Sequence, residues 1–352
     1  MTQPLLSVEH LAVHFAGRGR LFSPDPPPVK AVNDVSFTID SQRTFGLVGE
    51  SGSGKSTVAR AILQLVDIHD GSIHLDGDDV TRVARSAELG FRKRVQAVLQ
   101  DPFSSLNQVH TTETIIGDPI TRHLAIKAGD ERRERVADLL DLVGLGHEFL
   151  DRYPYEMSGG QRQRISIARA LAVEPDLVIA DEATSALDVS IQSQVINLLR
   201  EIQRERDVAF LFIAHDLEVV SHMSHDVGVM YLGYLVERGP SDEVYAQPTH
   251  PYTEMLIASI PFPEPGEQAK RRGLRQTFKV AEPPSPANLP PGCPFENRCP
   301  VAMDICREEM PAVTQAHHGG EARCHLHTSG PELGGGSVVE FIRSEARGNV
   351  GV

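Results

Sequence analysis

Two glycine-containing segments of this chain carry residues that suit phosphate binding. Residues 49–57 read Gly-Glu-Ser-Gly-Ser-Gly-Lys-Ser-Thr and fit the pattern G-x4-G-K-S/T. Residues 157–164 read Met-Ser-Gly-Gly-Gln-Arg-Gln-Arg and suit the start of a helix. Ser158 can cap that helix, and the backbone N–H groups of Gly159 and Gly160 lie at its positive end, where an anion binds favourably. The wide separation of the two segments argues against one nucleotide in one chain contacting both.

The first segment has the flanking elements that its pattern requires. Phe45–Val48 is a short apolar run of strand type, and Val58–Val66 is typical of an amphipathic helix. In this loop Lys55 reaches the β- and γ-phosphates, Ser56 offers its hydroxyl to Mg²⁺, and Thr57 can contact the α-phosphate. The residues that we expect to contact a nucleotide here are Gly49, Ser51, Gly52, Ser53, Gly54, Lys55, Ser56 and Thr57.

Two adjacent carboxylates, Asp181 and Glu182, end the apolar run Leu177–Ala180. Neighbouring side chains of a strand point in different directions, so the two carboxylates can have different roles. We expect Asp181 to hold Mg²⁺ through water and Glu182 to polarise the attacking water as a general base. Two solvated acids at a strand end are the alternative, and the upstream phosphate pattern disfavours it.

Three further side chains, His215, Gln100 and Phe15, suggest a nucleotide site only when taken together with the phosphate loop and the two carboxylates. His215 ends the apolar run Ala209–Ala214, where its imidazole can sense the γ-phosphate, and Gln100 could reach the metal or the lytic water. Phe15 could stack on the base. Taken alone, a histidine at a strand end is more often structural, and Phe15 is more often a core residue.

The elements that must position these residues alternate between strands and helices. Leu177–Ala180 and Ala209–Ala214 are typical of parallel strands buried on both faces, and the amphipathic stretch Ile191–Ile202 separates them. This rhythm predicts a doubly wound α/β core. We further expect a helix at Arg132–Val143, strands at Leu5–Phe15 and Val29–Ile39 with a turn at Asn33-Asp34, and a surface loop at Ala16–Pro28.

Composition excludes several classes of protein. The chain has 352 residues, 40% of them hydrophobic and 23% charged, as is usual for a soluble globular protein. Its net charge of -14 argues against a nucleic-acid binder, because such proteins normally carry a basic stripe. Neither a membrane-spanning run nor a signal-peptide core is visible, so a cytoplasmic location is expected.

Proline and glycine divide the chain into expected regions. Residues 261–300 hold ten of the 24 prolines, which favours an extended connector without regular elements. We therefore expect a nucleotide-binding domain at 1–260, a proline-rich linker at 261–292, a four-cysteine region at 293–327 and a disordered tail at 328–352.

The ordered set of phosphate loop, Gln100, Ser-Gly-Gly-Gln, Asp-Glu, Ser-Ala-Leu-Asp at 185–188 and His215 resembles the nucleotide-binding subunit of an ATP-binding-cassette (ABC) transporter, over roughly residues 5–245. The resemblance implies a P-loop NTPase fold with a RecA-like core, an antiparallel β subdomain and a helical signature subdomain. In that family two subunits pair head to tail with ATP between them. Ser158, Gly159, Gly160 and Gln161 would then contact the γ-phosphate of ATP held by the partner.

Other segments resemble the peptide/nickel importers within that family. They are Gln-Asp-Pro-Phe-Ser-Ser-Leu-Asn at 100–107, His-Pro-Tyr at 250–252, Pro-Pro-Gly-Cys-Pro-Phe at 290–295 and an insertion at 16–28 like that of "F"-type ATPases. The resemblance implies ATP-driven uptake of oligopeptides or dipeptides, at the cytoplasmic face of a membrane. It also implies a related "D"-type ATPase as heterodimer partner, two permeases and an extracytoplasmic binding protein. Import of nickel or another solute is the serious alternative, and a soluble ABC protein acting on DNA or ribosomes is disfavoured.

All four cysteines, Cys293, Cys299, Cys306 and Cys324, lie within 32 residues, which in a cytosolic chain favours metal binding over disulfides. Structural zinc usually uses tighter knuckles, so the wide spacing favours a [4Fe–4S] cluster, and tails of the resembling importers are associated with one. Zinc and no bound metal remain alternatives, and one of His317, His318, His325 or His327 could replace a thiolate. We expect a structural role that leaves ATP binding independent of the cysteines.

Overall fold

The computed structural model describes residues 3–17, 26–185, 187–316, 319–328, 338 and 340–342, and it contains two sheets. The smaller, antiparallel sheet has the order β2 (Val29–Ile39), β1 (Leu6–Phe15), β4 (Asp70–Leu75) and β5 (Asp78–Asp79). The larger sheet has the order β11 (Val313–Gln315), β12 (Glu321–Arg323), β10 (Tyr234–Pro240), β9 (Asp226–Tyr231), β3 (Thr44–Val48), β8 (Ala209–Ala214), β7 (Leu177–Asp181) and β6 (Val95–Val98). Its strands run parallel from β9 to β6.

The parallel strands separate two apolar cores. Along β8, Leu211 and Ile213 belong to one core and Phe210 and Phe212 to the other, as the alternation of side chains along a strand requires. The first core is completed by the smaller sheet and by α1 (Lys55–Ile62), which contacts both sheets. Because both faces of β8 are covered, its whole length is apolar and buried.

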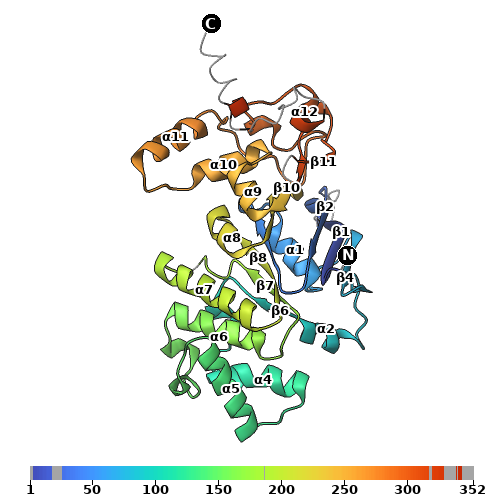
Figure 1. The fold of residues 1–352 in the computed structure, drawn as a ribbon. Helices are drawn as coiled ribbons and strands as arrows, with labels where there is room; N and C mark the ends of the chain where they lie inside the picture. The colour runs from blue at the N-terminus through green and yellow to red at the C-terminus, as the bar shows by residue number, and fades with distance from the viewer. Residues whose placement is uncertain are drawn as a thin grey trace.

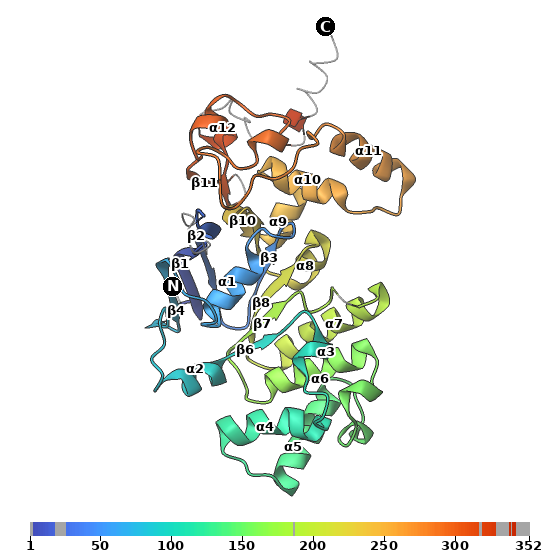
Figure 2. The same ribbon diagram turned by 180° about the vertical axis from the view of Figure 1, so that it is seen from behind.

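The helices of the second core extend away from the sheet at one end of the molecule, as Figures 1 and 2 show from opposite sides. A four-residue α3 and the longer α4, α5 and α6 form this end, and α7 and α8 connect β7, β8 and β9. The bounds are α2 (Glu88–Arg94), α3 (Pro102–Ser105), α4 (Thr112–Leu124), α5 (Asp130–Leu142), α6 (Gly159–Leu171), α7 (Val189–Glu205) and α8 (Leu217–Met223).

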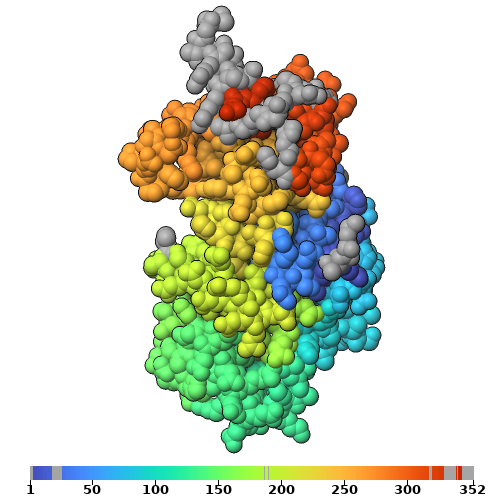
Figure 3. Space-filling view, in the orientation of Figure 1, coloured from blue at the N-terminus to red at the C-terminus, as the bar shows by residue number. Residues whose placement is uncertain are grey.

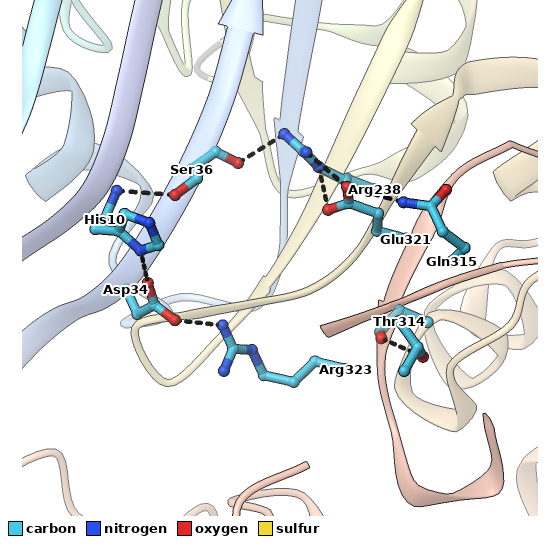
Figure 4. Close-up of polar contacts among 9 residues, drawn as sticks. His10, Asp34, Ser36, Arg238, Thr314, Gln315, Glu321 and Arg323 are labelled. Atoms are coloured by element: carbon cyan, nitrogen blue, oxygen red, sulfur yellow. Dashed lines mark hydrogen bonds and ion pairs between the residues drawn. The ribbon is translucent and has the colours of Figure 1, made fainter. Parts of the chain in front are cut away.

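The C-terminal elements lie at the opposite end from the helices α4 and α5 (Figure 3). They are α9 (Ser241–Ala246), α10 (Pro251–Ser259), α11 (Pro265–Arg275), α12 (Ile305–Glu308) and the hairpin of β11 and β12. Strand β12 pairs with β10 of the larger sheet. Arg238 binds the carboxylate of Glu321 and the Ser36 carbonyl, and Arg323 binds Asp34 at 2.6 Å, so the hairpin is tied to both sheets (Figure 4).

The strands and helices expected around both phosphate segments are confirmed, with ends shifted by a few residues. The turn expected at Asn33-Asp34 is wrong, because β2 continues through it. Asp34 has a φ of 51° and the pairing with β1 shifts register nearby, so the residues that suggested a turn make an irregularity in a strand. Most of the expected loop at 16–28 lies outside the described residues.

Two further expectations about the C-terminal third are corrected. The segment 261–292 contains helix α11, because Pro265 occupies the helix start, where its missing N–H costs nothing, and no proline follows before Pro283. Val338 and Ile342 are buried in the second core, which contradicts a tail disordered throughout 328–352. His317, His318 and most of that tail lie outside the described residues. Within the described part of the chain, no helix is long and apolar enough to cross a membrane.

Candidate functional site

The loop at residues 49–57, called the phosphate loop below, joins β3 to α1 at the carboxyl edge of the parallel strands. Gly49 has a φ of 156°, and a Cβ there would lie 2.2 Å from the Met230 carbonyl oxygen. Gly54 has a φ of 108°, and a Cβ there would lie 2.4 Å from the Ala31 carbonyl oxygen. Only glycine therefore allows the loop to curl this tightly against β9 and β2.

Lys55 points its ammonium group back into the phosphate loop. Its Nζ donates to the carbonyl oxygens of Gly49 at 2.7 Å and Glu50 at 2.9 Å. Burial lowers the pKa of Lys55, and the nearby carboxylates of Glu182 and Asp181 oppose that shift. The chain thus holds one buried cation beside two carboxylates at the place where the phosphates of a nucleotide are expected.

Ser56 at the start of α1 and Asp181 at the end of β7 bring two oxygen ligands together. The Ser56 hydroxyl donates to Asp181 Oδ1 at 3.0 Å. Burial raises the pKa of Asp181, and the hydrogen bond from Ser56 counteracts it. A hydroxyl and a carboxylate oxygen are ligands that Mg²⁺ accepts, so the pair fits the expected magnesium position.

Glu182 leaves the strand in an unusual conformation. Its φ is 49°, and its N–H donates to the Ile213 carbonyl oxygen of β8 at 3.0 Å. A non-glycine residue rarely adopts this left-handed conformation, and such residues cluster at functional sites. Asp181 ends the strand and Glu182 begins the turn after it, and the division of roles between them stays a prediction.

His215 and Gln100 follow β8 and β6 at the same carboxyl edge, and both are exposed. Phe15 ends β1 opposite Val29, with 39% of its surface exposed. Among the described residues, no recorded hydrogen bond or ion pair joins any of these three to the phosphate loop. Their roles at the γ-phosphate, the metal and the base stay predictions.

Residues 158–161, called the signature turn below, begin α6. Ser158 Oγ accepts from the Gln161 N–H at 3.3 Å, and Gln161 Oε1 accepts from the Ser158 N–H at 2.9 Å. This reciprocal pair is a capping box, so the predicted cap is confirmed. Ser158 and Gly159 are exposed, and within the part of the chain that the structure describes no recorded polar contact joins the signature turn to the phosphate loop.

Sequence reasoning missed two residues, Tyr252 and Arg298, that hold the phosphate loop from the C-terminal third. The Glu50 N–H donates to the Tyr252 hydroxyl at 2.8 Å, and Arg298 binds the Glu50 carboxylate with both nitrogens, at 2.8 and 2.9 Å. Arg298 also approaches the Tyr231 hydroxyl. Tyr252 belongs to the His-Pro-Tyr triplet noted in the sequence, whereas nothing in residue type or spacing singled out Arg298.

The four cysteines line one internal cavity together with His250 and Phe295. Burial, and then the proximity of other thiols, raises the pKa of Cys299 to about 12 and that of Cys324 well above its ordinary value. His250 Nδ1 accepts from the Tyr252 N–H, while its Nε2 is buried and has no hydrogen-bond partner among the described residues. Among the described residues, no group of three or more His, Cys, Asp or Glu side chains is arranged so that it could hold a metal ion. Convergent thiols and an orphaned N–H nevertheless fit a larger thiolate-bound group.

Comparison with known proteins finds two family matches and several similar relatives. Residues 32–185 match the family described as "ABC transporter", and residues 236–306 match "Oligopeptide/dipeptide transporter, C-terminal region". A probable peptide ABC transporter ATP-binding protein of Sinorhizobium fredii is 46% identical over 93% of this chain and 91% of its own length. An oligopeptide transport ATP-binding protein of Bacillus subtilis, AppF, is also 46% identical, over 93% of this chain and 98% of its own length.

Solved structures show the same fold. The cbiO1 subunit of an ABC transporter complex from Clostridium perfringens superposes with a TM-score of 0.60 and 26% identity, over 70% of this chain and 92% of that one. An ATP-binding cassette in a post-hydrolysis dimer with ADP and Pi superposes with a TM-score of 0.59 and 24% identity, over 67% of this chain and 98% of that one. The phosphate loop and the signature turn therefore lie on an ATP-binding-cassette fold.

Proposed function

The chain belongs to the ABC transporter ATPases, and from that membership we propose that it powers the import of oligopeptides or dipeptides. The observation that carries the peptide assignment is the match of residues 236–306 to an oligopeptide/dipeptide transporter region. Relatives at 45–46% identity over at least 92% of this chain, named for peptide or oligopeptide transport, support it. The same chain then contains both the ATPase and a C-terminal region typical of peptide transport systems.

Hydrolysis in this site depends mainly on positioning and charge. Lys55 is held where it can neutralise the β- and γ-phosphates, and Ser56 with Asp181 would hold Mg²⁺. The ion, when bound, neutralises charge that develops on the phosphate oxygens. Glu182 accepts a proton from the attacking water, while His215 and Gln100 orient the γ-phosphate and that water.

We assign the signature turn to the ATP of a second ATPase subunit. The cap is complete without help and engages the N–H groups of Ser158 and Gln161, which leaves those of Gly159 and Gly160 for an anion from outside the chain. A related D-type subunit is the proposed partner, which makes the active unit a heterodimer. Two permeases, an extracytoplasmic binding protein and a position at the cytoplasmic face of the membrane complete the proposed system.

We further propose that Cys293, Cys299, Cys306 and Cys324 hold a [4Fe–4S] cluster, with Zn²⁺ as the alternative. Their convergence on one cavity supports it, because four thiolates are the usual ligands of such a cluster. Anaerobically purified protein should contain iron and absorb near ~400 nm, and Cys299→Ser should lose both signals. Zinc without iron would establish the alternative, and neither metal would exclude both.

The transport assignment is tested with the intact complex of ATPases, permeases and binding protein in lipid vesicles. Added peptides should stimulate ATP hydrolysis and accumulate inside, and the Glu182→Gln complex should do neither. Stimulation by nickel but not by peptides would replace the peptide assignment with nickel import. Hydrolysis that responds to neither solute would contradict both.

A further inference from the structure

Glu50 is an acidic residue placed inside a loop that must receive an anion. It is the second residue of the phosphate loop, and its carbonyl oxygen accepts from Lys55 Nζ at 2.9 Å and from the Ser53 N–H at 3.2 Å. Its side chain is only 36% exposed. An uncompensated carboxylate here would repel the phosphates of ATP at short range and across a partly desolvated gap.

Arg298 compensates that carboxylate from the far end of the chain. Its two terminal nitrogens bind the two carboxylate oxygens of Glu50, and its side chain is only 13% exposed. This paired geometry, which lysine cannot reproduce, raises the pKa of Arg298. The guanidinium also lies over the rings of Tyr231 and Phe295.

The backbone around Arg298 is as firmly held as its side chain. The Arg298 N–H donates to the Phe295 carbonyl oxygen at 3.0 Å, and the Arg298 carbonyl oxygen accepts from Lys279 at 3.2 Å. Phe295 is fully buried and packs edge-on against Tyr231 and Tyr252. Tyr252 in turn accepts the Glu50 N–H, so two independent contacts from beyond residue 250 converge on one residue of the phosphate loop.

We propose that Arg298 is a positioning residue of the nucleotide site, which neutralises Glu50 and fixes it away from the phosphates. Residues 293–327, called the cysteine-rich region below, thereby neutralise a negative charge of the phosphate loop through Arg298 without contacting ATP. This inference rests on the ATP-binding function assigned above. Loss of Arg298 should weaken ATP binding because the Glu50 carboxylate is left without its counter-charge, and not because packing is lost.

The experiment compares Arg298→Gln, Glu50→Gln, the double variant and Arg298→Lys in the full-length chain. Affinity for a fluorescent ATP analogue is measured by titration, and KM and kcat are measured in the assembled complex. Arg298→Gln should weaken ATP binding and raise KM about tenfold, with a much smaller change in kcat. The double variant should recover most of that loss, because it removes the carboxylate that Arg298 neutralised. Arg298→Lys should fall between wild type and Arg298→Gln.

Arg307→Gln is the matched control, because Arg307, whose side chain is 62% exposed, pairs with Glu296 in the same region at 2.8 Å. It should bind ATP like wild type. Equal affinity of Arg298→Gln and wild type, or a double variant as weak as Arg298→Gln, would overturn the proposal. If Arg298→Gln does not fold, the ATP affinities of Arg298→Lys and the double variant are compared instead. Tighter ATP binding by the double variant than by Arg298→Lys supports the proposal, and weaker binding refutes it. Failure of wild type itself to bind ATP would instead refute the assigned function.

Discussion

The phosphate loop and the signature turn are both proposed to bind phosphate through backbone N–H groups, yet the contacts that hold them in place differ. The phosphate loop is contacted by β2, β9, α10 and the cysteine-rich region, and its lysine is buried. Ser158 and Gly159 of the signature turn are exposed, and the recorded polar contacts of its described residues stay within the turn and the first residues of α6. The phosphate loop is held by contacts from distant parts of the chain, whereas the signature turn is formed by one helix end.

This difference fits a site that is divided between two subunits. A loop that holds its own nucleotide gains from being rigid before the ligand arrives, since preorganised charge needs no rearrangement. A turn that must meet another subunit's nucleotide has to remain accessible. The contrast predicts that damage to the phosphate loop abolishes binding, whereas damage to the signature turn spares binding and affects pairing.

The largest effect is expected from Lys55→Ala. Removing the buried ammonium takes away the charge that meets the β- and γ-phosphates, so affinity for ATP should fall at least ~100-fold. Titration with a fluorescent ATP analogue measures it, with circular dichroism to confirm folding. Lys270→Ala, which removes an exposed lysine of α11, is the control and should bind normally. Unchanged affinity in Lys55→Ala would mean that the loop does not hold the phosphates.

Glu182→Gln should separate binding from chemistry. An amide cannot accept a proton, so hydrolysis should fall on the order of 100-fold or more while ATP still binds. With chemistry blocked, ATP should trap the closed pair of subunits, which size-exclusion chromatography with and without ATP detects. Normal hydrolysis by this variant would show that another group is the general base.

The contribution of sequence to these conclusions differs between the two regions. The signature turn could be predicted in detail, because a cap and its partner three residues later are local and leave a mark in residue order. The strand ends that carry Asp181 and His215 were predictable for a similar reason, since apolar runs mark buried parallel strands. Local patterns report local geometry.

The supports of the phosphate loop could not be predicted in the same way. Arg298 meets Glu50 across 248 positions of sequence, and no periodicity or spacing encodes such a contact. No sequence pattern therefore indicated that Arg298, which precedes Cys299, binds the loop, and the independence of ATP binding from the cysteines stays a prediction. Helix α11 was missed for another reason: proline content was averaged over a segment whose prolines lie at its two ends.

Ser158→Asp tests the signature turn with little change to its helix. Aspartate caps a helix about as well as serine, so α6 should keep its start, but the added negative charge would repel the γ-phosphate that we propose the turn binds on a second subunit. ATP hydrolysis by the paired subunits should fall ~10–100-fold, while the affinity of the single chain for ATP stays within ~2-fold. Ser158→Asn keeps the cap without the charge and should lose less activity. Weaker ATP binding by the isolated Ser158→Asp chain would contradict a divided site.

The smallest effect is expected where the C-terminal hairpin is tied to the sheets that carry the phosphate loop. Arg238 lowers the pKa of Glu321 below its ordinary value of 4.5, and both side chains are partly buried. Glu321→Gln should lower the free energy of unfolding by about 1 kcal/mol at pH 7, with ATP binding unchanged. The folded pKa is the lower one, so the contribution is complete above pH 4.5 and is lost as the pH falls through the folded value. Urea unfolding should therefore show that the difference in free energy of unfolding between Glu321→Gln and wild type is smaller at acid pH than at pH 7. The exposed control Glu308→Gln should show no such change. A difference that stays constant with pH would mean that the hairpin is held by its strand pairing with β10 and not by this ion pair.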